Sequence, residues 1–274
     1  LRDRYADLIR ARFPNIKRRV SGYNLDQLLP ENGFNVARAL VGTEGTCALT
    51  LAAKVRLVKS PAKRVVLVLG FDDIYLAGDA VPEYQSFGPI AIEGLDYKII
   101  RGLQERNLAK AEIDLLPPGN AWVVVEFGDD TLEGAIAQAE KAQEYFKTRT
   151  KGPQPSTWLV SDSQLQKRIW SIRENGASAT HLSIDPNSPD PVVGWEDAAV
   201  DPSRLGEYLR AFQALVDSYG YQTSLYGHFG DGCIHARITF NLRSAEGVAK
   251  FRSFIRDAAT LVVEFGGSRS EERR

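Results

Sequence analysis

The sequence predicts an α+β fold with a large, mainly antiparallel sheet and a ferredoxin-like arrangement of strands and helices. Strand-like and helical stretches alternate from residue 64 onwards, which indicates helices layered on a sheet. No nucleotide-binding glycine fingerprint accompanies the alternation, and this disfavours a doubly wound parallel sheet. A content of 43% hydrophobic and 25% charged residues over 274 positions is typical of one large or two modest globular domains.

The elements follow in order along the chain. A first helix is expected over residues 2–13, and a short apolar helix over 35–40 precedes the glycine-rich stretch VGTEGT. The next predicted strand is LTLAAKVRLVKS, which closes a first block. The later strands are expected at RVVLVLGF, PIAIEGL, AWVVVEF, STWLVS and ATHLSI, with helices over 72–87, 96–107, 131–147, 163–174 and 202–219. A last helix, over 244–265, carries one apolar face and stops at Gly266-Gly267.

Charge and cysteine content narrow the class of protein. Thirty-four basic and 35 acidic residues leave a net charge of −1, which gives no electrostatic footprint for nucleic acid or an anionic membrane. No apolar run approaches the roughly 20 residues of a transmembrane helix. Cys47 and Cys233 form neither a metal-finger nor a disulfide framework, so reduced thiols in a cytoplasmic protein are expected. The chain has no methionine and begins inside a predicted helix, so we expect an internal piece of a longer protein.

The stretch YGHFGDGCIHARI holds two of the three histidines in the chain. Asp231-Gly232 is the favoured centre of a two-residue type I′ hairpin, which would set His228 directly opposite His235 and Tyr226 opposite Arg237, all on one face. Two imidazoles at that separation suit zinc or a similar divalent ion. An aromatic cross-strand pair on a half-buried face is the alternative. The third histidine, His181, has no partner and is interpreted as structural.

Two other features have a functional and a structural interpretation. In VGTEGT, successive backbone N–H groups could cradle a phosphate, or the stretch is a tight connection between elements. Arg173 shares the apolar stripe of its predicted helix. Its guanidinium would then either extend to water near the helix C-terminus or hold an anionic ligand.

These motifs resemble a known family. GTEGT followed by LTLAAKVRLVKSP resembles the end of the flavin-binding domain in FAD-linked oxidases of the vanillyl-alcohol-oxidase type. YGHFGDGCIH, an apolar helix and GGS resemble the C-terminal motif of the branch that contains glycolate oxidases, D-lactate dehydrogenases and D-2-hydroxyglutarate dehydrogenases. RRVSGYNLDQLLPENGFNVARALVGTEGTC and GWEDAAVDPSRL resemble long bacterial proteins that fuse this flavoprotein to an iron–sulfur domain.

The resemblance implies a division of the chain into three parts. Residues 1–61 would end the FAD-binding domain, 62–225 would form the substrate-binding cap with its sheet, and 226–274 would return to the flavin site. It also implies FAD as cofactor, a divalent metal, a small carboxylate substrate and an iron–sulfur cluster outside this chain. The expected location is the cytoplasm, either free in it or peripheral to the inner membrane. A homodimer is left open.

The resemblance assigns roles to individual residues as well. His228 and His235 match the catalytic, metal-binding histidines, and Glu272 takes the place of the third metal ligand by count, although the tail GGSRSEERR departs from the family pattern. Arg173 matches the arginine that binds the substrate carboxylate. Arg237 stands where some members have Asn, and would suit a substrate with a second acidic group. The residues that match the segment along the cofactor are Gly42, Thr43, Glu44, Gly45 and Thr46.

Together these features predict part of an FAD-dependent dehydrogenase that oxidises a D-2-hydroxy acid. Two other classes stay open at this point. One is a flavin-independent, metal-dependent hydrolase that uses His228 and His235. The other is a non-catalytic α+β interaction module in which the hairpin is structural.

Overall fold

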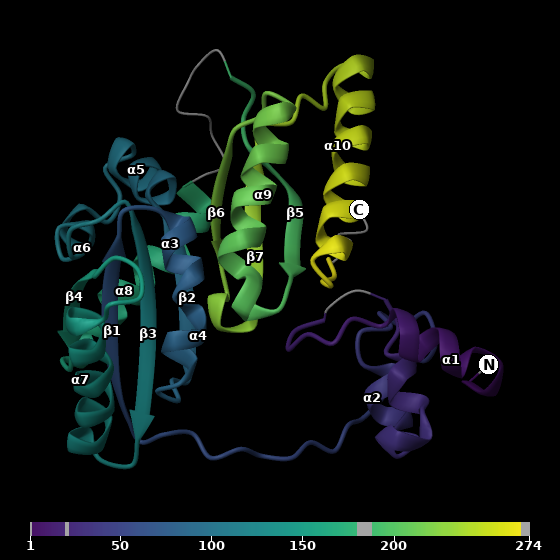
Figure 1. The fold of residues 1–274 in the computed structure, drawn as a ribbon, viewed down its shortest axis with the longest axis horizontal. Helices are drawn as coiled ribbons and strands as arrows, with labels where there is room; N and C mark the ends of the chain where they lie inside the picture. Colours follow the sequence, from purple (N-terminus) through teal and green to yellow (C-terminus); the bar gives the residue numbers. More distant parts are fainter. Residues whose placement is uncertain (1, 20–21, 180–187, 270–274) are drawn as a thin grey trace.

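The computed structural model describes residues 2–19, 22–179 and 188–269 of the chain. Within them the strands form one seven-stranded sheet of order β4-β1-β3-β2-β6-β7-β5, in which neighbouring strands are antiparallel (Figure 1). The α+β prediction is therefore confirmed. The strands are β1 (Lys63–Phe71), β2 (Ala91–Asp96), β3 (Ala121–Asp129), β4 (Ser156–Val160), β5 (Val192–Ala199), β6 (Thr223–Gly227) and β7 (Cys233–Ile238).

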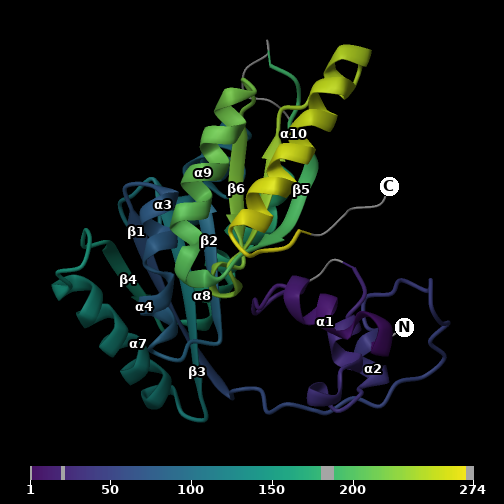
Figure 2. The same ribbon diagram turned by 45° about the vertical axis from the view of Figure 1, so that its right-hand side comes forward.

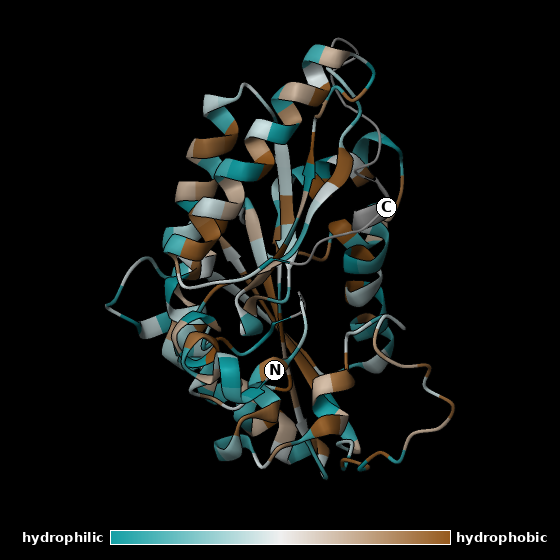
Figure 3. Cartoon of the chain, turned by 90° about the vertical axis from the view of Figure 1, so that its right-hand side faces the viewer, coloured by the Kyte–Doolittle hydropathy of each residue, from teal (hydrophilic) through white to brown (hydrophobic). Residues whose placement is uncertain are grey.

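Helices cover both faces of the sheet, which explains why its inner strands are apolar along almost their whole length. In β1, Leu67 and Leu69 belong to one core and Val66 and Val68 to the other, as the two-residue period of a strand requires. The hydrophobic colour of Figure 3 follows these central strands. The first core includes α3 (Ile74–Asp79), α4 (Val81–Gln85), α7 (Leu132–Thr148), α9 (Leu205–Ser218) and α10 (Ala245–Glu264), and the second includes α5 (Tyr97–Glu105), α6 (Lys110–Ile113) and α8 (Ser163–Ala179).

The N-terminal residues form a small helical unit beside the sheet. It contains α1 (Arg2–Arg12), α2 (Val36–Leu40) and two short 3₁₀ turns, and an extended segment joins it to β1 (Figures 1 and 2). The predicted strand LTLAAKVRLVKS is wrong for this structure, because the segment pairs with no strand among the described residues. Leu49, Leu51 and Leu57 are each more than four-fifths exposed. A strand is defined by its ladder of hydrogen bonds, so an apolar alternating sequence without a neighbouring edge stays irregular.

Most other predicted elements are present, and the structure differs from the prediction in a few places. The helix expected over 72–87 is two short helices, α3 and α4, with Pro82 in the first turn of the second. Strand β5 was not expected, and ATHLSI lies almost entirely outside the described residues, as does His181. The division at 61/62 and 225/226 stays a prediction, and its second boundary falls inside β6. In the part of the chain that the structure describes, no helix is both long and apolar enough to cross a membrane.

Candidate functional site

The two histidines lie where the β6–β7 hairpin turns, between β2 on one side and β5 on the other. Their ring centroids are 5.1 Å apart and the planes are nearly perpendicular, at 85°. The ring of Tyr226 stands 4.9 Å from that of His235 on the same face. This face also carries the second hydrophobic core, so the site is built against α8 and α5.

The predicted register of the hairpin is wrong by two residues. Tyr226 is paired with His235 and Ser224 with Arg237, whereas the two-residue turn would pair Tyr226 with Arg237. A type I′ turn needs positive φ at both central residues, and of the pair Asp231-Gly232 only Gly232 has it, at 66°. The connection is instead a 3₁₀ turn over Phe229–Asp231.

Phe229, within the longer turn, packs the hairpin against β2. Its ring is fully buried and packs so closely on Gly94 of β2 that a Cβ at position 94 would collide with it. This contact fixes the turn against β2. Because the slip is an even number of residues, the side-chain alternation is preserved and the histidines still share a face with Tyr226.

His228 makes a hydrogen bond across to β2. Its Nδ1 is 2.6 Å from Oε1 of Glu93, whose Oε2 accepts a hydrogen bond of 3.0 Å from Nε of Arg173 on α8. The guanidinium of Arg173 in turn lies 5.7 Å from the ring centroid of Tyr226, within the range of a cation–π contact. The predicted substrate-binding arginine is therefore held beside the histidines by an acidic partner.

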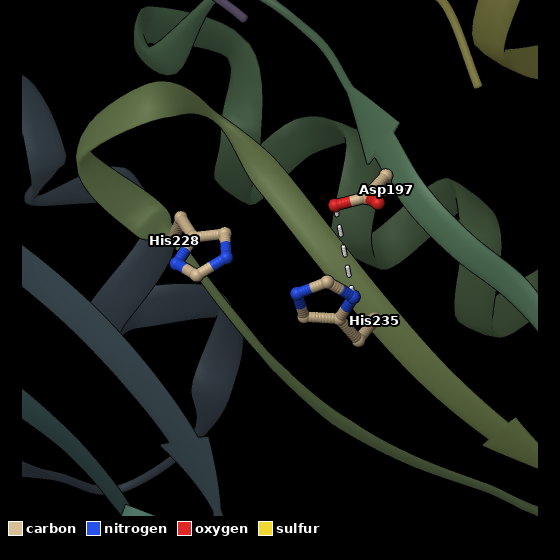
Figure 4. Close-up of side chains that lie close together, drawn as sticks. All are labelled: Asp197, His228 and His235. Carbon is tan, nitrogen blue, oxygen red and sulfur yellow. Dashed lines mark ion pairs between the residues drawn. The ribbon is translucent and has the colours of Figure 1, made fainter. Parts of the chain in front are cut away.

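His235 faces two consecutive acidic residues of β5. Its Nδ1 is 2.8 Å from Oε2 of Glu196. The same nitrogen is 3.9 Å from Oδ1 of Asp197 (Figure 4). Successive side chains of a regular strand point to opposite faces, but the β5–β7 register shifts between Trp195 and Ala198, and Asp197 has a φ of 49°. This bulge is what brings both carboxylates to one imidazole.

Arg237 lies two residues after His235 on β7 and therefore on the same face of the sheet. Its guanidinium is in a very short ion pair with Oε1 of Glu196 and lies 5.5 Å from the Tyr226 ring centroid. Arg173 and Arg237 thus both contact the ring of Tyr226. Burial and the charge of Glu196 raise the pKa of Tyr226 to about 12, so its phenol stays protonated near neutral pH.

Polar atoms at the site are left without partners in the described part of the chain. Nδ1 of His235 and Nε of Arg237 are buried and make no hydrogen bond, although Glu196 is close to both side chains. Buried polar atoms of this kind are rare in proteins and often mark a place that a ligand or ion completes. His228, His235 and Asp197 each offer one ligand atom, and these atoms all lie within 4.8 Å of one another. This donor set fits a divalent metal with open coordination positions.

A cavity of about 370 Å³ opens beside His228. Glu93 and the turn residues Gly230 and Asp231 line it, together with Lys17 and Arg18 of the N-terminal unit. Nζ of Lys17 is 2.7 Å from Asp231, and Arg18 lies 3.4 Å from the same carboxylate. Burial acts to raise the pKa of Asp231, but these two cations outweigh it and hold the pKa below its usual value.

The glycine-rich turn lies at a different cavity, of about 480 Å³, between the N-terminal unit and the C-terminal end of α10. Gly42 and Gly45 both have positive φ, as the sequence suggests, and Thr43 is buried. Among the described residues, neither histidine lines this cavity. Its lining includes Tyr23, Gly42, Thr43, Glu44, Thr46, Val262, Gly267 and Ser268.

The structure therefore brings together four of the predicted site residues and adds three that sequence reasoning missed. Glu272 lies outside the described residues. The added residues are Glu93, Glu196 and Asp197. The acidic pair in GWEDAAV was a visible signal for the last two, whereas only the pairing of β2 with β6 identifies Glu93.

Comparisons with known proteins show what the chain is similar to. Residues 60–272 match the family described as FAD linked oxidases, C-terminal domain. D-2-hydroxyglutarate dehydrogenase of Pseudomonas putida is 24% identical, over 97% of this chain and 27% of its own length. Glycolate oxidase subunit GlcD of Bacillus subtilis is 24% identical over 86% of this chain and 48% of its own. A solved p-cresol methylhydroxylase aligns over 76% of this chain and 45% of its own, with a TM-score of 0.49 at 12% identity. The chain spans about a quarter of the length of the D-2-hydroxyglutarate dehydrogenases it matches.

Proposed function

The chain belongs to the FAD-linked oxidases, and on this basis we propose that it forms the substrate side of a dehydrogenase for D-2-hydroxy acids. The observation that carries the proposal is the single face on which two imidazoles and two guanidiniums surround Tyr226. That combination suits a substrate with a hydroxyl to be deprotonated and carboxylates to be held.

The residues divide into two roles. The guanidiniums of Arg173 and Arg237 would orient the substrate through its carboxylates, because each offers a planar fork of donors. The two imidazoles would act on the C2 hydroxyl either as ligands of a metal that polarises it or, where a ring nitrogen is free of metal, as the base that takes its proton. A neutral imidazole suits this role better than Tyr226, whose phenol is held in its protonated form.

Two non-protein groups fit the arrangement. His228, His235 and Asp197 would hold a divalent metal, and Glu272, which lies outside the described residues, stays the further ligand that the resemblance implies. The glycine-rich turn, Gly42–Thr46 in the sequence, would hold part of FAD at the cavity beside α10. When bound, the flavin supplies a hydride acceptor and the metal supplies Lewis-acid polarisation of the substrate oxygen.

A dicarboxylate is the substrate class that the site supports best. Arg173 and Arg237 come from different elements and approach Tyr226 separately, so they can hold two acidic groups. The relatives named D-2-hydroxyglutarate dehydrogenase support the same choice. The resemblance of GWEDAAVDPSRL to the fused bacterial proteins supports an iron–sulfur domain as electron acceptor, which iron analysis of the natural full-length protein would test.

The test is an anaerobic visible spectrum of the natural full-length protein, titrated with D-2-hydroxyglutarate, D-lactate, glycolate and the L forms. Bleaching of a flavin band by a D acid supports the proposal. A protein with metal but without a flavin band refutes it and favours the hydrolase alternative. Arg237→Ala serves as the specificity control, and should lower kcat/KM at least tenfold more for D-2-hydroxyglutarate than for D-lactate. Equal losses would contradict the assignment of Arg237 to a second carboxylate.

A further inference from the structure

Two buried carboxylates at the site repeat one arrangement. Glu93 lies between the imidazole of His228, at 2.6 Å, and the guanidinium of Arg173, at 3.0 Å. Glu196 lies between the imidazole of His235, whose Nδ1 is 2.8 Å away as a close charge contact without a hydrogen bond, and the guanidinium of Arg237. Each catalytic histidine therefore shares one acidic residue with one substrate-binding arginine.

The sheet itself produces this repeat. The β6–β7 hairpin is flanked by β2 and β5, and each flanking strand supplies one of the carboxylates. Continuing the β2–β6 register beyond Gly94↔Gly227 places Glu93 opposite His228. On the other side, the bulge of β5 directs Glu196 to its two partners.

The environment makes these carboxylates dependent on their partners. The side chains of Glu93 and Glu196 are only 12% and 11% exposed. A buried carboxylate is stable only when positive charge or hydrogen-bond donors compensate it. If its arginine is drawn to another anion, each glutamate keeps the imidazole as its remaining partner.

We propose that Glu93 and Glu196 are positioning residues that hold the two histidines and release the two arginines to a dicarboxylate substrate. The carboxylates of the substrate replace the glutamates at the guanidiniums, and each glutamate then interacts with its imidazole alone. This inference rests on the proposed function, because it takes the histidines as catalytic and metal-binding and the arginines as substrate-binding.

Glutamine at either position separates this role from a structural one. Glu93→Gln or Glu196→Gln keeps the shape of the side chain but removes the charge that holds the guanidinium. The arginine is then free for the ligand, so dicarboxylate affinity should be unchanged or tighter. The histidine loses its acidic partner, and loss of such a partner typically weakens metal binding 10- to 100-fold.

Glu126 offers a matched control on the same face of the sheet. Its side chain is 10% exposed, it pairs with Arg64 and it accepts a hydrogen bond of 3.2 Å from Trp170, so it has a similar burial and a similar arginine partner. No contact joins it to either histidine among the described residues. Glu126→Gln should therefore report only the general cost of neutralising a buried glutamate.

The experiment measures three quantities on the natural full-length protein and the three variants. Calorimetric titration gives the affinity for Zn²⁺ and, separately, for glutarate, a dicarboxylate without an oxidisable hydroxyl, and steady-state assays give kcat and KM. Thermal unfolding shows which variants are folded. For one that is not, the Asp variant at the same position is measured instead, because its shorter carboxylate does not span both partners.

The expected result is a 10- to 100-fold loss of Zn²⁺ affinity and a lower kcat in Glu93→Gln and Glu196→Gln, with glutarate affinity and KM unchanged or improved. Glu126→Gln should match the natural protein. Parallel losses of zinc and glutarate binding, or equal effects in Glu126→Gln, would overturn the inference while leaving the proposed function intact. If the natural protein itself binds neither zinc nor glutarate, the proposed function fails as well.

Discussion

Replacing Gly232 by alanine tests whether the turn between β6 and β7 packs closely against the bulged strand β5. Gly232 has a φ of 66°, and a Cβ there would collide with the backbone oxygen of Val200, just after β5. Because the obstacle is backbone rather than a flexible side chain, relief requires movement of the turn or of β5. The backbones are also joined by a hydrogen bond of 3.0 Å from the Val200 N–H to the Gly232 oxygen.

The expected loss of unfolding free energy in Gly232→Ala has two parts. A left-handed backbone conformation costs a residue with a Cβ about 1–2 kcal/mol, and forced overpacking adds roughly 1–3 kcal/mol. Gly232→Ala should therefore lower the free energy of unfolding by about 2–5 kcal/mol. Gly220, with a φ of 62° and nothing within 4 Å of its Cβ position, isolates the first part, so Gly220→Ala should cost only about 1–2 kcal/mol.

Urea unfolding followed by circular dichroism measures both variants under the same conditions. The difference between them is the cost of the contact with Val200. Equal destabilisation of the two variants would refute the close packing of the turn on β5. The Gly232 variant should also bind Zn²⁺ more weakly, since the turn carries His228 and the displaced strand carries Asp197, whereas the Gly220 variant should not.

Two further predictions concern charge and reactivity near the hairpin. Cys233 is fully buried, and burial raises the pKa of its thiol. In the native protein a maleimide should therefore label the exposed Cys47 and leave Cys233 unmodified until the chain is unfolded. Labelling of both thiols at similar rates would contradict the burial of the hairpin. Asp231→Asn should reduce stability at pH 7 by at most about 1 kcal/mol, because the partly exposed ion pairs with Lys17 and Arg18 are lost. The folded-state pKa of Asp231 lies below its usual 3.8, so its contribution is present above pH 3.8 and is lost as the pH falls through the folded-state pKa. A difference between variant and natural protein that does not shrink in urea unfolding as the pH is lowered below 3.8 would count against this ion pair.

The sequence by itself determined the class of fold and which hairpin residues share the face of the site. Alternating apolar runs predicted strands, and because side-chain direction has a period of two, the shared face of Tyr226, His228, His235 and Arg237 did not depend on the details of the turn. The positive φ of the glycines in VGTEGT also follows from local sequence, since few other residues adopt that conformation.

Only the tertiary structure decided the register and the acidic partners. The type I′ signal of Asp231-Gly232 was overridden: the connection is a 3₁₀ turn in which Phe229 is buried and Asp231 pairs with Lys17 of the N-terminal unit. Glu93 and Asp197 are far from the histidines along the chain, so strand order and a bulge, neither of which local sequence encodes, bring them there. The segment LTLAAKVRLVKS shows that apolar alternation alone does not determine a strand, since a strand forms only where another strand edge is present to pair with it.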